Sequence, residues 1–308
     1  KYAYTTLLTR SSYLAGVIIL AHTLHKQSTY PLYVLYTSTL DASSVRALEL
    51  ESNKTKLIPL LTLPLLPNSS QPISLIAERF ADTWTKLRVF EALADKGLGK
   101  VCYLDADMLI TGPIDDVFAA ADLPDENWIA ANHVCCCNLD ADEWADADWT
   151  PENCPYTPLS HPAALTTATP VTEEARETYH LLNGGQFVFQ PSPLLWTRIL
   201  DSFNTSVNLA AYKFPDQDFL AAFFRNRFLP LPWRFNALKT MRYWHPNIWR
   251  DECVVCVHYI VDKPWAARVA SDGRAGYVGK DGETHKWWWE AFGAWKQERE
   301  GQKVRDLV

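Results

Sequence analysis

Short apolar runs alternate with amphipathic segments over the first hundred residues. Apolar runs cover residues 2–8, 31–37, 56–66 and 100–104. Between them, residues 13–26, 42–52 and 82–99 have helical spacing, with Asp41 and Asp82 as N-caps and Gly97 and Gly99 as a stop. Strand, helix, strand order predicts an α/β fold with a central, mostly parallel sheet and helices on both faces.

Residues 122–180 interrupt this alternation. They are rich in Asp, Pro, Thr, Trp and Cys, and only residues 127–134 have the pattern of a strand. Further strands are expected at 184–190, 227–232 and 253–259, helices from Ser192 and Pro215, and a Trp-rich helix at 284–300. We therefore expect one domain over residues 1–308, in which residues 122–180 form an insertion on the acceptor side.

Composition excludes several function classes. The net charge is −7 and no long run of Lys or Arg occurs, which argues against a nucleic-acid groove. The best membrane candidate, residues 13–21, is too short and contains Gly16. Seven cysteines, three of them consecutive, favour a reduced, cytoplasmic location over a disulfide framework.

Two carboxylates, Asp105 and Asp107, directly follow the apolar run at 100–104. Residues two apart on an extended segment face the same way, so both acids can point into the crevice where a strand ends. Two like charges this close favour a cation beside them. Mg²⁺ and Mn²⁺ prefer such oxygen ligands. The simpler interpretation of the pair is a polar turn.

Three further segments carry candidate site residues, each with a simpler alternative. His258 ends an apolar run and Lys263 follows it, which suits a metal ligand and a phosphate contact, although a lone histidine is more often a core residue. Asn183 and Gly184 precede a strand, as in a tight turn. Acids after Pro215 usually serve the helix dipole.

Taken together, the motifs resemble glycosyltransferase family 8 over nearly the whole chain. They are "TKLRVFEALADKGLGKVCYLDADMLITGPIDDVF", "LLNGGQFVFQPS", "FPDQDFLAAFF" and "VHYIVDKPW", in this order. The resemblance implies a Rossmann-like nucleotide-binding fold of the GT-A type. It also implies a retaining transferase that uses a UDP-sugar and Mn²⁺ or Mg²⁺.

The same resemblance assigns roles by position. The metal ligands would be Asp105, Asp107 and His258, Lys263 would bind the diphosphate, and Ala106 would be a further donor-binding residue. Uracil and ribose would lie against Leu7, Thr9 and Tyr13, and Lys86 would contact the donor. The sugar pocket would contain Asn183, Gly184, Asp216 and Gln217, with Asp216 near the reacting carbon and Gln217 and Asn183 as its catalytic neighbours.

The acceptor stays open among alternatives. Within the family, the Cys cluster with a later "NCP" and the segment "YWHPNIW" resemble galactinol synthases, which implies UDP-galactose and myo-inositol. A more distant likeness to glycogenins implies UDP-glucose and a tyrosine of the chain itself. A non-catalytic module that binds UDP or a sugar is a third reading. Trp144, Trp149 and Tyr156 are candidate flat surfaces for an acceptor ring, or simply part of a cover over the core.

Two features remain outside this assignment. Cys135, Cys136, Cys137, Cys154 and His161 are of the types that bind Zn²⁺, but three consecutive cysteines do not match ordinary ligand spacing, which favours plain thiols. The Trp-rich last helix suits the interface of a homodimer.

Overall fold

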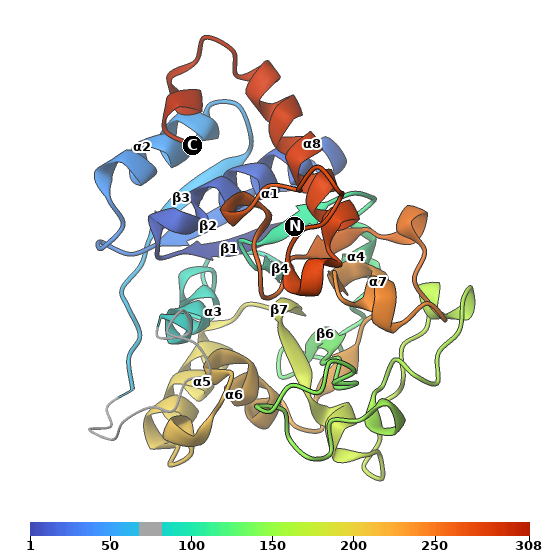
Figure 1. Ribbon diagram of the computed structural model, residues 1–308. Coiled ribbons are helices and arrows are strands. Elements are labelled where there is room, and N and C mark those ends of the chain that lie inside the picture. Colours follow the sequence, from blue (N-terminus) through green and yellow to red (C-terminus); the bar gives the residue numbers. More distant parts are fainter. Residues whose placement is uncertain (68–81) are drawn as a thin grey trace. The chain divides into compact units, whose positions relative to one another are not determined.

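The structure, a computed structural model, describes residues 1–67 and 82–308, which include every candidate site residue (Figure 1). The chain forms two compact units. Unit 1 consists of Lys1–Ala3, Thr62–Tyr103 and Val117–Trp233, and unit 2 of Tyr4–Leu61, Leu104–Asp116 and Arg234–Val308. The single domain over residues 1–308, with an insertion at 122–180, stays a prediction.

Unit 2 begins with the predicted alternation of strands and helices. Its strands β1 (Tyr2–Leu8), β2 (Leu32–Tyr36) and β3 (Leu57–Leu61) are parallel and lie in the order β3-β2-β1, linked by α1 (Leu14–Gln27) and α2 (Ala42–Ser52). The Asp41 carboxylate accepts a hydrogen bond from the Ser44 N–H at 2.9 Å, which confirms the predicted cap. A 3₁₀ turn, η1 (Ser11–Tyr13), precedes α1, and Tyr13 is the N-cap of that helix.

A second, three-stranded sheet in unit 2 has the order β5-β10-β9. It consists of β5 (Met108–Ile110), β10 (Cys256–His258) and β9 (Ala237–Leu238). β5 and β10 are antiparallel, with His258 opposite Met108, whereas β9 is parallel to β10. This small sheet therefore brings a segment near residue 258 beside the acidic pair.

The C-terminal part of unit 2 packs on its first helices. α7 (Met241–Trp244) is short, and α8 (Gly282–Glu298) packs against α1. Just beyond α8, Arg299 forms a buried bidentate pair with Glu51 of α2, with distances of 2.6 Å for Nη2–Oε1 and 3.1 Å for Nε–Oε2. The Trp295 indole N–H donates to the same carboxylate at 3.3 Å. Glu51 is therefore buried with its charge fully compensated.

Unit 1 contains the other four strands of the α/β fold. They are β4 (Lys100–Leu104), β7 (Leu182–Phe189), β6 (Ile129–His133) and β8 (Phe228–Pro230), in the order β4-β7-β6-β8. β6 is parallel to β8 and antiparallel to β7, so parallel and antiparallel pairs are mixed. The α/β class predicted from the alternation is confirmed.

The helices of unit 1 are α3 (Arg88–Ala92), α4 (Asp116–Ala120), α5 (Pro193–Thr205) and α6 (Pro215–Phe223). α6 packs on β7, and α5 lies beside α6 (Figure 1). The long helix expected over residues 82–99 is wrong: a 3₁₀ segment, η3 (Thr83–Leu87), leads into the short α3. β-branched Thr83, Thr85 and Val89 lower the helix propensity there.

The described residues include no helix with the length and hydropathy that a membrane span requires.

Candidate active site

The two acids occupy a three-residue link between strands. β4 ends at Leu104 and β5 begins at Met108, so Asp105 and Asp107 lie on the turn between them. Pairing of β10 with β5 sets His258 opposite Met108, and the Tyr259 N–H donates to the Asp107 carbonyl at 2.9 Å. The His258 Nε2 is then 3.4 Å from Asp107 Oδ1 and 3.9 Å from Asp105 Oδ2. The three predicted ligands therefore come together, with ligand atoms within 4.8 Å of one another.

A buried asparagine orients the imidazole. The His258 Nδ1 lies 3.0 Å from the Asn236 Oδ1, and Asn236 is fully buried. An amide oxygen only accepts, so Nδ1 donates to Asn236, and Nε2 faces the two carboxylates. Two carboxylates and an imidazole so oriented fit a divalent cation with oxygen and nitrogen ligands.

Lys263 adds a positive charge to this group. Its ammonium donates to the Asp107 carboxylate and, at 2.7 Å, to the Tyr259 carbonyl. Burial by itself raises the pKa of the Asp107 carboxyl, but the Lys263 ammonium and the His258 imidazole outweigh it and hold that pKa well below its usual range. Asp107 is therefore a carboxylate, the form that binds a cation.

Close packing against α1 fixes the acidic link. A Cβ on Gly16 would lie 2.5 Å from the Ala106 carbonyl oxygen and 2.7 Å from the Trp265 ring, so only glycine fits. The Trp265 ring meets that of Tyr13 edge-on at 5.6 Å, and the Lys263 Nζ lies 6.0 Å from the Tyr13 ring. The structure thus brings Tyr13, predicted to contact the nucleoside, close to Lys263. Leu7 lies near the end of β1, and Thr9 follows it.

A second group of predicted residues lies in unit 1. The Lys86 Nζ is 2.5 Å from Asp216 Oδ2 and donates to the Gly184 carbonyl at 3.0 Å. The Gly184 N–H donates to the Gln217 Oε1 at 3.1 Å. Lys86 and Asp216 are both buried, and a Cβ on Gly184 would lie 3.2 Å from the Asp216 carboxylate. Four residues from η3, β7 and α6 thus form one network, in which Asp216 is paired with a lysine rather than merely serving the helix dipole. Asn183, next to Gly184, accepts a hydrogen bond from the Gly185 N–H at 3.0 Å.

A cavity of about 480 Å³ opens beside this network in unit 1. Gln217, Asp218 and Trp149 are among the residues that line it. Burial raises the pKa of the Asp218 carboxyl to about 6, against the hydrogen bond from the Phe214 N–H that lowers it. Trp144 packs edge-on against Trp149 at 5.6 Å. The suggestion that Tyr156 offers a ligand surface is wrong, because its ring is buried and its hydroxyl donates to the His133 carbonyl at 2.8 Å.

Sequence reasoning missed the residues that support these groups. Asn236 follows no pattern that marks a site, and Trp265 ends the motif "VHYIVDKPW" without a role of its own assigned to it. Lys239 and Asp281 form a fully buried pair, and the Lys239 ammonium also donates to the Asp262 carbonyl at 2.9 Å, next to Lys263. Such partners are distant in sequence, and only the fold brings them together.

Comparison with known proteins places the chain in a family. The sequence profile of glycosyl transferase family 8 matches residues 5–268. The chain is 28% identical to galactinol synthase 1 of Solanum lycopersicum over 268 residues, covering 85% of this chain and 73% of that protein. It is 29% identical to galactinol synthase 7 of Arabidopsis thaliana over 273 residues, covering 85% and 74%.

The fold also matches a solved structure. The galactosyltransferase LgtC, crystallised with donor and acceptor sugar analogues, superposes with a TM-score of 0.58 at 17% identity, over 94% of this chain and 95% of that one. The profile match over most of the chain confirms the resemblance drawn from the motifs. The chain belongs to glycosyl transferase family 8, a family of retaining, UDP-sugar-dependent glycosyltransferases that typically use a divalent metal.

Proposed function

We propose that this protein transfers galactose from UDP-galactose to a hydroxyl group of myo-inositol, with retention at the anomeric carbon. The observation that carries the proposal is the group of Asp105, Asp107 and His258 with Lys263 beside it. This combination suits a leaving group that bears two phosphates, because it offers a cation site and a separate ammonium.

The donor's diphosphate is assigned to unit 2. Asp105, Asp107 and His258 would hold Mn²⁺ or Mg²⁺, which when bound supplies Lewis-acid stabilisation to the diphosphate oxygens. The Lys263 ammonium, which bonds to Asp107 in the structure, would donate to a diphosphate oxygen and stabilise the charge that grows there. Tyr13, Leu7 and Thr9 would contact uracil and ribose, and Ala106 would place its backbone against the diphosphate.

The hexose is assigned to the network in unit 1. The Asp216 carboxylate would stabilise positive charge at the anomeric carbon as the bond to the diphosphate oxygen breaks. Lys86 fixes that carboxylate in place. Since the Gln217 oxygen already accepts from Gly184, its NH₂ group is oriented to donate to a sugar hydroxyl. Asn183 and Gly184 complete the pocket. The acceptor oxygen forms the new bond, and its proton passes to the departing UDP.

Two observations support a polyhydroxylated acceptor. The relatives described above are galactinol synthases. The cavity beside Gln217 is lined by the carboxylates of Asp146, Asp148, Glu177 and Asp218, which accept hydrogen bonds from hydroxyl groups.

UDP release with a matrix of donors and acceptors tests the proposal. UDP-galactose and UDP-glucose are each supplied with myo-inositol or with no acceptor, in Mn²⁺ and in EDTA, and the intact mass of the protein is measured afterwards. We expect release that requires UDP-galactose, myo-inositol and the metal. A ladder of hexose additions to the protein would instead support self-glucosylation. UDP binding without turnover under any condition would support a binding module.

A further inference from the structure

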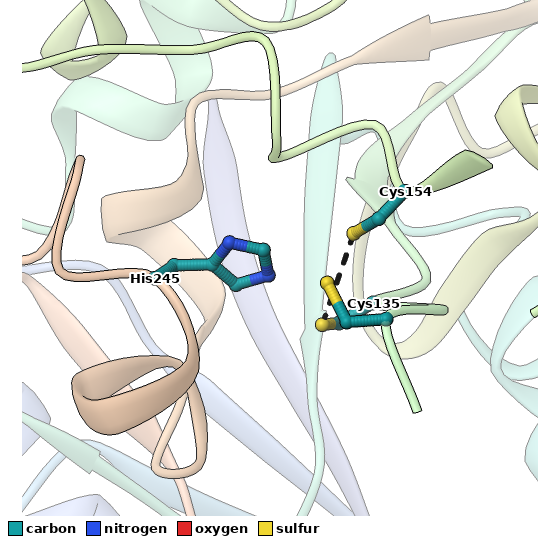
Figure 2. A group of neighbouring side chains, drawn as sticks. Cys135, Cys154 and His245 are labelled. Carbon is teal, nitrogen blue, oxygen red and sulfur yellow. Dashed lines mark hydrogen bonds between the residues drawn. The ribbon is translucent and has the colours of Figure 1, made fainter. Parts of the chain in front are cut away.

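Three cysteines of unit 1 gather their sulfur atoms in one place. Cys135 and Cys137 follow β6, and Cys154 follows a 3₁₀ turn, η4 (Pro151–Asn153). All three side chains are buried, and their sulfur atoms lie within 4.8 Å of one another. Figure 2 shows Cys135 and Cys154 pointing toward each other, with 4.0 Å between the sulfur atoms. All seven cysteines are in the described part of the chain, and none is in a disulfide.

Three consecutive cysteines do not match ordinary metal-ligand spacing, but the backbone conformation removes this objection. Residues two apart on an extended segment share a face, so Cys135 and Cys137 can reach one point while Cys136 does not. The Cys136 sulfur donates to the Asn153 carbonyl at 3.4 Å and also bonds to Cys154, but it is outside the group of mutually close ligand atoms. The ligand pattern is therefore C-x-C with one distant cysteine, rather than three in a row. His161 is also outside that group among the described residues.

The distances suit a metal better than a disulfide. A tetrahedral zinc ion with Zn–S bonds of about 2.3 Å sets its sulfur ligands about 3.8 Å apart. The 4.0 Å between Cys135 and Cys154 is close to that value. A disulfide requires about 2.05 Å, roughly half the distance observed.

Charge also favours a soft cation at this point. Thiolates packed this closely repel one another unless a cation replaces their protons, and thiolate ligands select zinc over hard ions such as Mg²⁺. The site would thus differ in chemistry from the carboxylate group in unit 2.

An ion at this location would stabilise a segment that has little secondary structure. Between β6 and β7 the described chain contains only short 3₁₀ turns: η4, η5 (Ala163–Leu165) and η6 (Glu177–His180). Little secondary structure holds this segment in place, although Trp149, Glu177 and His180 line the cavity beside Gln217. A metal cross-link between residues 135–137 and 154 would restrict this segment in the folded state, where the ligands are brought together.

We propose that Cys135, Cys137 and Cys154 bind one structural zinc ion, completed by a fourth ligand from elsewhere in the chain. The ion fixes residues 134–181 and so shapes the cavity proposed for the acceptor. The zinc site itself does not depend on the proposed function, because zinc content is measured separately from turnover.

Zinc content of the full chain, purified under reducing conditions and exposed to equimolar Zn²⁺ followed by desalting, tests this proposal. We expect about one zinc per chain, as for a closed structural site. Cys135→Ser, Cys137→Ser and Cys154→Ser should each weaken zinc binding by more than the roughly 10–100-fold that changes around a ligand cause. Cys136→Ser, a buried thiol in the same segment, and Cys102→Ser in β4 are matched controls that should keep the ion.

Cobalt titration of the unchanged protein provides a measurement that needs no variant to fold. Co²⁺ bound by three thiolates in tetrahedral geometry gives intense visible absorption, which Zn²⁺ then displaces. Alanine scanning of the eight histidines identifies a fourth ligand of that type. The proposal is overturned if wild-type protein retains no zinc and gives no thiolate–cobalt band. It is equally overturned if alkylation and mass spectrometry show a Cys135–Cys154 disulfide, or if Cys136→Ser loses the ion as the other three do.

Discussion

Unit 2 contains two aspartate–lysine pairs with the same chemistry and different surroundings. Lys239 and Asp281 lie 2.6 Å apart, and both side chains are 0% exposed. Asp107 and Lys263 also form an ion pair, but their side chains are 9% and 13% exposed, and Asp105 beside them is 26% exposed. The first pair is sealed, whereas the second can be reached by a ligand.

The two pairs also differ in their balance of charge. Lys239 and Asp281 neutralise each other, and the ammonium also donates to the Asp262 carbonyl and lies 3.4 Å from the His285 Nε2. Around Lys263 there are two carboxylates and an imidazole for one ammonium, so negative charge is in excess. A buried ion pair whose charges cancel is thus a structural element. A group in which carboxylates outnumber the cationic side chains is instead suited to binding a ligand.

The largest expected effect comes from the accessible pair. Asp107→Asn removes a metal ligand while keeping the shape of the side chain, and we expect UDP-sugar turnover to fall at least about 10³-fold, equivalent to about 4 kcal/mol. UDP release in excess Mn²⁺ measures it. Asp272→Asn, which makes the same charge change at a side chain 62% exposed, is the control and should leave turnover unchanged. Normal turnover by Asp107→Asn would remove the metal-anchor role.

We expect the fully buried pair, Lys239 and Asp281, to contribute more to the free energy of unfolding than the accessible pair does. Lys239→Met leaves Asp281 buried without compensation, and we expect a loss of about 3–5 kcal/mol in the free energy of unfolding, measured with denaturant. The double variant Lys239→Met, Asp281→Leu should recover most of that loss. Lys263→Met should cost clearly less because its surroundings are accessible to water. Equal losses for the two lysines would break the distinction between the pairs.

Lys263→Ala tests the catalytic side of the comparison. If its ammonium stabilises charge that develops on UDP, kcat should fall about 10²–10³-fold, or about 2.7–4 kcal/mol. A rise in KM with kcat unchanged would show that Lys263 contributes to binding alone.

The smallest effects concern pH. Asp107 has a lowered pKa, so its contribution to stability is present above its ordinary value near 3.8 and is lost as the pH falls below it. Asp218 has a raised pKa of about 6, so its ionisation costs stability as the pH rises from about 4 to 6. In EDTA, Asp107→Asn should therefore lower Tm at pH 7, whereas Asp218→Asn should raise it by about 3 °C, or roughly 1 kcal/mol for a half-buried group. The Asp218 difference should shrink as the pH falls from 6 to 4, whereas the Asp107 difference should persist at pH 4 and shrink only below it. Shifts of the same sign at pH 7 would contradict the assignment.

Much of this architecture could be predicted because local patterns dictate it. The apolar runs specify β1, β2 and β4, and the run at 100–104 puts Asp105 and Asp107 directly after a strand. Residues two apart on an extended segment share a face, so Cys135 groups with Cys137 and Cys136 is left out. Three consecutive cysteines in the sequence do not suggest this grouping. β5 has only three residues, too few for a periodic signal, and yet it is the strand that brings His258 to Asp107.

The remaining contacts depend on distant parts of the chain. Lys86 and Asp216 are 130 positions apart, and Asn236 orients His258 from a neighbouring segment without any motif of its own. Helical spacing alone also misleads where β-branched residues lower the helix propensity, as in the segment that follows Asp82, which divides into η3 and α3. Sequence patterns predict the candidate ligands at the end of one strand. Only the tertiary structure shows which basic side chain pairs with which acid.

The buried ion pair between Glu51 and Arg299 limits how far the chain can be shortened from its C-terminal side. The family profile stops at residue 268, and cutting there would retain every residue assigned to the donor. It would also strip the arginine and the indole from an interior carboxylate, which would then have to take up a proton or draw in water. A minimal version should therefore extend past residue 299, and purification tags belong beyond that point.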